Sequence, residues 1–114
     1  MAVKDMHNDL KSAILNAGFE PTPMGHQIEA FNDNTSVSGK INFTFLNSVN
    51  NSTKDISSSI SIPVGNVIVN KLRIYKTSGS QLLAYIDLEG TEIKDFTGEV
   101  SGGIYQINTL KISI

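Results

Sequence analysis

Apolar and polar residues alternate along much of the chain, and a period of two is typical of strands with one face in a core. The segment Lys40–Leu46 places Ile41, Phe43 and Phe45 on one face and polar residues on the other. The segment Asp55–Pro63 repeats this pattern with isoleucines on one face and serines on the other. Both segments are therefore predicted to be half-buried strands.

The last third of the chain carries the clearest hairpin signal. Strands are predicted over Asn66–Tyr75 and Gln81–Leu88, and the segment Thr77–Ser80 between them has the composition of a tight turn. Apolar residues lie on both faces of the first strand, which favours a central place in a sheet. A final strand is predicted over Ile104–Ile114, with a bulge or kink near Asn108, where the apolar parity changes.

Shorter elements are predicted between these strands. Gln27–Phe31 alternates over a few residues and is predicted to be a short strand, and Asn32–Asn34 is predicted to be a turn. The polar segment Asn47–Thr53 is predicted to be a loop. Pro63 and Gly65 are expected to end the strand that precedes them.

The N-terminal segment has a different period. Apolar residues recur every three or four positions over Val3–Ala17, which predicts an amphipathic helix that ends at Gly18. Met6, Leu10 and Ile14 lie on its apolar stripe. This stripe is expected to pack either on the sheet of its own chain or on a partner, and the three residues are candidate interaction residues.

These elements predict a mainly β (α+β) protein: an antiparallel β-sandwich or small barrel with one N-terminal helix. The length of 114 residues fits one domain over residues 1–114. Within it, residues 1–20 would carry the helix and residues 26–114 the β region.

Composition narrows the classes of function. Apolar residues make up 39% and charged residues 18% of the chain, and the net charge is −2, so binding to nucleic acid through phosphate contacts is not expected. The chain has no cysteine, which excludes disulfides and thiol chemistry. Neither a signal peptide nor a membrane-spanning run is recognisable, so we expect synthesis in a cytoplasm and no membrane partner.

No catalytic, metal or cofactor motif is recognisable. His7 and His26 are the only histidines and have no companion ligands at metal-binding spacing. An acidic cluster surrounds Gly90 without the spacing of a helix–loop–helix calcium site; it consists of Asp87, Glu89, Glu92 and Asp95. We therefore expect no cofactor, no metal and no enzyme activity, and a small enzyme that uses the acids near Glu89 is the weakest alternative.

Tyr75, Tyr85 and Tyr105 are the aromatic candidates for a binding surface. Strand alternation allows all three to lie on one face of a sheet, where neighbouring strands would bring them together. Packing between strands is the more ordinary role for such rings. A tyrosine-lined platform for a ligand is the alternative.

Three segments of the β region carry a resemblance to a known class. Val69–Tyr75 reads VNKLRIY, Leu82–Leu88 reads LLAYIDL after a glycine-centred turn, and Tyr105–Ile112 reads YQINTLKI. Over roughly Ile60–Ile114 this pattern resembles small bacteriophage and prophage virion proteins of the tail, fibre or head-decoration type. The resemblance implies a β-rich structural protein that is made in a bacterial cytoplasm, and it carries over no catalytic residue.

Two leading hypotheses follow. The first is a non-enzymatic phage or prophage virion structural protein, assembled into a phage particle through contacts with itself or with other virion proteins. The second is a β module that binds host-surface carbohydrate or a protein receptor. The oligomeric state, the place in a virion and the ligand are open at this point.

Overall fold

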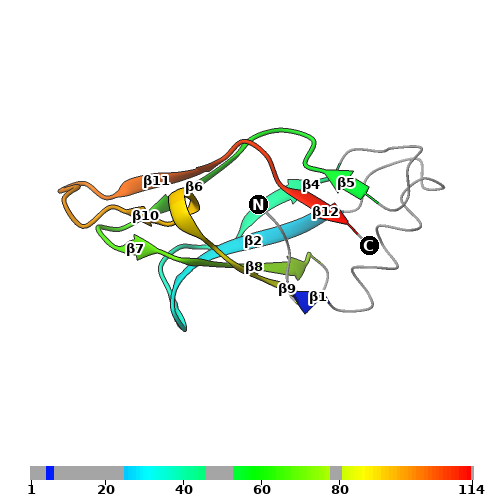
Figure 1. The fold of residues 1–114 in the computed structure, drawn as a ribbon, viewed down its shortest axis with the longest axis horizontal. Helices are drawn as coiled ribbons and strands as arrows, with labels where there is room; N and C mark the ends of the chain where they lie inside the picture. Colours follow the sequence, from blue (N-terminus) through cyan, green and yellow to red (C-terminus); the bar gives the residue numbers. More distant parts are fainter. Residues whose placement is uncertain (1–4, 7–24, 46–52, 78–80, 114) are drawn as a thin grey trace.

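The computed structural model describes residues 5–6, 25–45, 53–77 and 81–113, and its regular structure is almost entirely β. The strand pairs are antiparallel (Figure 1), so the predicted mainly β class is confirmed. The strands are β1 (Asp5–Met6), β2 (Gly25–Asn32), β3 (Thr35–Ser36), β4 (Ile41–Thr44), β5 (Thr53–Asp55), β6 (Ile60–Val64), β7 (Ile68–Val69), β8 (Lys71–Lys76), β9 (Leu82–Asp87), β10 (Lys94–Asp95), β11 (Gly103–Ile107) and β12 (Lys111–Ser113). A short 3-10 helix, η2 (Gly90–Glu92), follows β9.

The main sheet has the strand order β1-β9-β8-β2-β3, and β4 also pairs with β2. β2 and β8 lie at its centre, with Ile28 opposite Ile74. β8 and β9 form the predicted hairpin, with Arg73 opposite Tyr85. The single strand predicted over Asn66–Tyr75 is wrong, because the structure divides it at Asn70 into β7, which pairs with β10, and β8. β3 and β4 are successive partners of β2 along the chain, because the turn after β2 is followed first by β3 and then by β4.

A bulge interrupts the β8–β9 ladder. The register shifts between Ile74 and Tyr75, so that Ile74 lies opposite Ala84 and Tyr75 lies opposite Leu82. Leu83 is the extra residue on β9, and a bulge turns such a residue away from strict alternation. Leu83 and Ala84 are therefore both buried although they are neighbours in sequence.

The second layer is made of two chain segments, β5–β6 and β11–β12, that pair with each other and bend at the same place. β6 pairs with β11, and β5 pairs with β12. One segment leaves regular strand structure at Ser57–Ser59 and the other at 108–110, and the Ser59 hydroxyl donates to the Asn108 side-chain oxygen over 3.3 Å. The predicted kink near Asn108 is confirmed. The single strand predicted over Asp55–Pro63 is wrong, because the same bend divides it.

Two other predicted boundaries are corrected. Pro63 lies inside β6, opposite Ile104, and does not end the strand. Among the described strands β6 pairs only with β11, so a residue without an N–H fits where its nitrogen faces away from that partner. Thr53 belongs to β5, whereas the rest of the loop predicted over Asn47–Thr53 lies outside the described residues.

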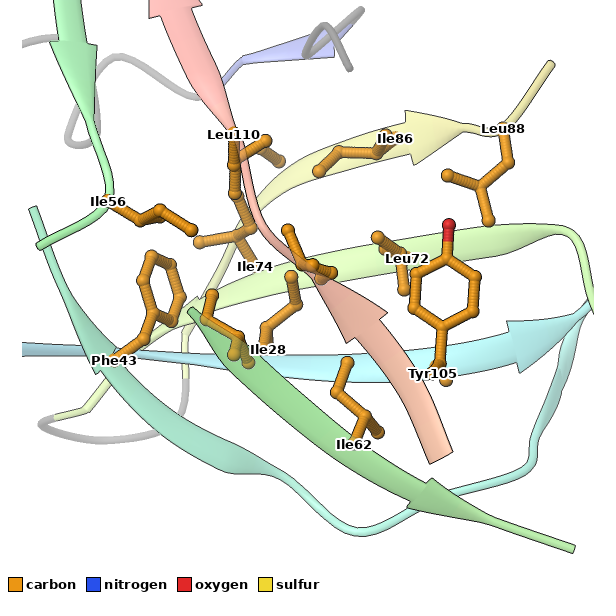
Figure 2. Close-up of a cluster of buried hydrophobic side chains, with 14 of the residues drawn as sticks. Ile28, Phe43, Ile56, Ile62, Leu72, Ile74, Ile86, Leu88, Tyr105 and Leu110 are labelled. Atoms are coloured by element: carbon orange, nitrogen blue, oxygen red, sulfur yellow. The ribbon is translucent and has the colours of Figure 1, made fainter. Parts of the chain in front are cut away.

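The hydrophobic core lies between the main sheet and the β6–β11 ladder. Figure 2 shows Ile62 and Tyr105, from the ladder, directed toward side chains of the main sheet such as Ile28 and Leu72. The alternating buried residues of β6 and β11 are what the apolar period predicts. The largest fully buried side chains are Ile28, Ile62, Val69, Leu72, Ile74, Ile86, Ile107 and Leu110.

The predicted N-terminal helix is not part of what the structure shows. Most of Val3–Ala17 lies outside the described residues. Its two described residues are in strand β1, where Asp5 lies opposite Tyr85 and Met6 opposite Ala84. The helix prediction is therefore wrong at these two positions, because their backbone pairs with the edge of β9.

Candidate functional site

The three candidate tyrosines do not lie on one face. Tyr75 and Tyr85 lie on the outer face of the main sheet, on β8 and β9. Tyr105 lies on β11 in the other layer, is only 2% exposed, and points into the core (Figure 2). Its hydroxyl donates to the Glu92 carbonyl oxygen over 2.6 Å. Burial, with the nearby negative charge of Glu92, raises the pKa of Tyr105 to about 12. The alternative of a platform lined by all three tyrosines is therefore wrong, because Tyr105 packs in the core.

Tyr75 is held by its neighbours on the outer face. Its hydroxyl donates to a Glu29 carboxylate oxygen over 2.7 Å, and the Lys40 ammonium lies 4.2 Å from the ring centroid. Burial and then the Glu29 carboxylate raise the pKa of Tyr75 to about 12, against an opposing effect of Arg73. Tyr75 is buried, its hydroxyl is bonded to Glu29 and its ring is in contact with Lys40, so it has little surface left for a ligand.

Arg73 and two aromatic rings form a row across three strands of the main sheet. The guanidinium carbon of Arg73 lies 4.0 Å from the ring centroid of Phe31 on β2 and 5.3 Å from that of Tyr85 on β9. Such contacts are favourable because a cation is attracted to the electron-rich face of a ring. Tyr85 remains 42% exposed, so part of its ring is available to a ligand. We call Phe31, Arg73 and Tyr85 the arginine row.

A hollow of about 270 Å³ opens beside this row. It is lined by residues from β8 and β9 together with the turn after β2: Asn34, Lys71, Leu72, Arg73, Tyr85, Ile86 and Asp87. Charged, amide and aromatic groups converge there, which is the composition of a small polar binding site.

The opposite side of the molecule has a different chemistry. The chain has no charged residue from Ile56 to Asn70 or from Val100 to Leu110, and these stretches contain β6 and β11. Alternation turns half of their side chains outward. The outward positions are Ser59, Ser61, Pro63, Ile104, Gln106 and Asn108, all of them exposed, and we call this surface the neutral face.

Hydrogen bonds and apolar groups share the neutral face. The Ser61 hydroxyl donates to the Gln106 side-chain oxygen over 2.6 Å. Ile104, which is 59% exposed, lies opposite Pro63, and Val100 is 98% exposed in the turn that leads to β11. Such a surface costs little free energy to desolvate, because its polar side chains already hydrogen-bond to one another and the others are apolar.

The acidic cluster is used in local turn structure. The Glu92 carboxylate accepts a hydrogen bond from the Glu89 backbone N–H over 3.0 Å, and the two residues form a capping box around η2. Asp95 accepts from the Thr97 backbone and hydroxyl, and these bonds lower the pKa of its carboxyl. Among the described residues, no group of three or more His, Cys, Asp or Glu side chains could hold a metal ion.

The remaining sequence candidates are placed as follows. His26 is buried on β2, with its ring centroid 5.8 Å from that of Phe43 and 5.1 Å from that of Phe45. Leu10 and Ile14, from the predicted helix stripe, lie outside the described residues, as does His7. Met6 is in β1.

Comparison with protein-family models, curated proteins and solved structures finds no match to the chain. In the described part of the chain, no helix has the length and apolar character required to cross a membrane. The candidate sites therefore rest on the geometry of the two faces.

Proposed function

We propose that this chain is a non-enzymatic structural protein that assembles through contacts between copies, with the neutral face as the contact surface. The observation that carries the proposal is the uncharged exterior of the β6–β11 ladder. The main sheet, by contrast, carries Glu29, Lys71, Arg73 and Asp87 on its exterior. Depletion of charge at the centre of a patch is what distinguishes protein interfaces from the rest of a surface.

The neutral face suits a second copy of the same chain. Each copy has a net charge of −2, and an uncharged surface lets two copies approach without placing like charges in contact. Soluble strand pairs are usually protected by charged side chains against association, and β6 and β11 carry none. A two-fold arrangement would bury the same residues of each copy against one another.

The role we propose is that of a phage or prophage virion protein of the tail, fibre or head-associated type. The segments Val69–Tyr75, Leu82–Leu88 and Tyr105–Ile112, which carry that resemblance, form β8, β9 and β11–β12, so they contribute to both layers. Two layers packed around one core favour the sandwich architecture over a barrel.

The assembly proposal is tested by sedimentation velocity over a concentration series. Gln106→Lys places a charge in the neutral face, whereas Thr35→Lys places one at an exposed position of β3 on the main sheet. We expect the wild type and Thr35→Lys to associate alike. The Gln106→Lys variant should need about tenfold higher concentration or more, because its charge must be desolvated in the contact. A wild type that stays monomeric at every concentration contradicts the proposal.

The virion role is tested separately by mass spectrometry of purified phage particles from the source strain. A structural protein is expected at a fixed ratio to the other particle proteins. Association in solution together with absence from particles would retain the assembly surface and refute the virion role.

A further inference from the structure

Arg73 is the only arginine of the chain, and it lies at the centre of the main sheet's outer face. Its flanking rings, Phe31 and Tyr85, come from the strands on either side of β8. Contact with two rings restricts the guanidinium, and its N–H groups can still donate further hydrogen bonds. A fork of donors held in this way is prepared for a planar, two-oxygen acceptor.

The acid that faces Arg73 is engaged elsewhere. Glu29 lies opposite Arg73 in the register, but its two carboxylate oxygens accept hydrogen bonds from Tyr75 over 2.7 Å and from Ser36 over 2.6 Å. Among the side chains that the structure describes, no carboxylate forms an ion pair with Arg73. Arg73 makes one hydrogen bond with the Tyr75 side chain, the contact that opposes the rise of the Tyr75 pKa. The guanidinium has five N–H donors, so it keeps further donors for a ligand in the hollow that it lines.

We propose that the hollow beside the arginine row binds a carboxylate group, with Arg73 as its bidentate partner and Tyr85 as the ring on which the rest of the ligand stacks. The volume of about 270 Å³ suits a ligand the size of one sugar ring or one amino-acid side chain. Lys71, two residues before Arg73 on the same face of β8, adds a second positive charge at the rim.

A neighbouring acid sets the charge that the ligand can carry. Asp87 lines the hollow opposite Lys71, so the charged lining residues Lys71, Arg73 and Asp87 together carry one net positive charge. A ligand with two negative charges meets more repulsion from Asp87 than a ligand with one. A singly charged carboxylate is therefore preferred over phosphate, and a uronic-acid sugar combines that charge with a ring that can stack on Tyr85.

This site lies on the main sheet and is independent of assembly through the neutral face. The test uses the full chain labelled with ¹⁵N, because the only arginine gives a single Nε–Hε signal in the NMR spectrum. That signal is followed during additions of glucuronate, of glucose as the uncharged sugar, of inorganic phosphate, and of N-acetylglutamate α-amide as the peptide acid. Sodium chloride keeps the ionic strength constant throughout.

The expected result is a saturable shift of the Arg73 signal with glucuronate, at a Kd in the millimolar range, and no shift with glucose. Tighter binding of glucuronate than of the peptide acid supports an acidic sugar as the ligand, and the reverse supports an acidic protein segment. The proposal is overturned if no carboxylate shifts the signal, or if the shift is no larger than the one caused by sodium chloride alone. Arg73 would then only pack against the two rings.

Two matched variants test whether Arg73 is the binding residue. Binding is followed by the backbone amide signal of Asp87, which lines the hollow, because Arg73→Gln has no arginine signal. Arg73→Gln and Lys76→Gln each remove one positive charge from β8, but Lys76 does not line the hollow. Glucuronate binding should weaken at least tenfold in the first variant and stay unchanged in the second. Equal weakening in both variants would refute the site, because it would show attraction to general positive charge. If Arg73→Gln fails to fold, the wild-type titration still decides the matter.

Discussion

Replacing Gly103 by alanine should destabilise the protein, because the ring of Phe96 already occupies the place of a β-carbon at this position. A β-carbon built on Gly103 lies 2.7 Å from both Cγ and Cε1 of Phe96 and even nearer to Cδ1. The ring packs against the hydrophobic core, which limits its movement, and the backbone of Phe96 is held by two hydrogen bonds. The Phe96 N–H donates to the Val67 carbonyl oxygen over 2.9 Å, and its own carbonyl accepts from the Glu99 N–H over 3.0 Å.

The size of the loss follows from two opposing effects. Overpacking a filled site costs about 1–3 kcal/mol. Replacing glycine by alanine reduces the freedom of the unfolded chain and returns about 0.4–1 kcal/mol. The expected net loss for Gly103→Ala is about 1–2 kcal/mol, which corresponds to a fall in Tm of about 4–8 °C for a domain of this size.

Urea unfolding followed by circular dichroism measures this loss against an internal control. Gly65→Ala is the control, because a β-carbon there meets nothing within 4 Å and its φ is not in the left-handed region. Its stability should stay within about 0.5 kcal/mol of the wild type or rise slightly. Phe96→Ala removes all the clashing ring atoms, so the double variant with Gly103→Ala should be more stable than the sum of the single effects by about 0.5–3 kcal/mol.

A Gly103→Ala protein as stable as the wild type would refute this reasoning. A double-variant cycle that is additive would also refute it, because it would show that Gly103 and Phe96 do not meet.

Three further predictions concern the core and the loops. The free energy of unfolding should be constant below about pH 10 and fall toward pH 12, because the folded state raises the pKa of Tyr75 and Tyr105 to about 12 and so favours their neutral phenols. Unfolding of the Tyr105→Phe variant, measured over the same pH range, should show a flatter decline. Ile62→Ala should lower the free energy of unfolding by about 2–5 kcal/mol in urea titrations, because the side chain is fully buried between the layers. Asn70→Ala should cost about 1–2 kcal/mol by thermal unfolding, because its side chain holds the Asp33 turn through bonds of 2.8 and 3.0 Å.

Each of these three expectations has a clear contrary result. An alkaline decline that is equally steep in Tyr105→Phe would exclude its phenol as a cause. A loss below about 1 kcal/mol for Ile62→Ala would contradict close packing of the two layers. An Asn70→Ala variant that unfolds with the wild type would show that the Asp33 turn forms without it.

The fold class could be predicted from local alternation, whereas the partners of the strands could not. The buried positions of β6 and β11 follow the period of two, and the kink at Asn108 is visible as a change of parity. The division of Asp55–Pro63 was missed, because it depends on the kink in a strand that lies far along the chain. At Asp5 and Met6 the helical spacing was outweighed by pairing with β9.

The candidate sites were only partly visible in the sequence for the same reason. Alternation alone does not tell which layer a strand joins, so Tyr105 could not be separated from Tyr75 and Tyr85. The sequence does not reveal Arg73 as a site residue, because the rings of Phe31 and Tyr85 that flank it come from distant segments. The one usable signal was that Arg73 is the only arginine of the chain. The neutral face also had a signal, the absence of charge over residues 56–70 and 100–110.

The most direct test of the central claim is a cross-saturation NMR measurement on a mixture of copies. Deuterated, ¹⁵N-labelled chains are mixed with unlabelled chains, and the protons of the unlabelled chains are saturated. Self-assembly through the neutral face predicts that amide signals lose intensity mainly at Ser61, Ile104 and Gln106. No loss at any residue, or a loss concentrated on the main sheet around Tyr85, would contradict the claim.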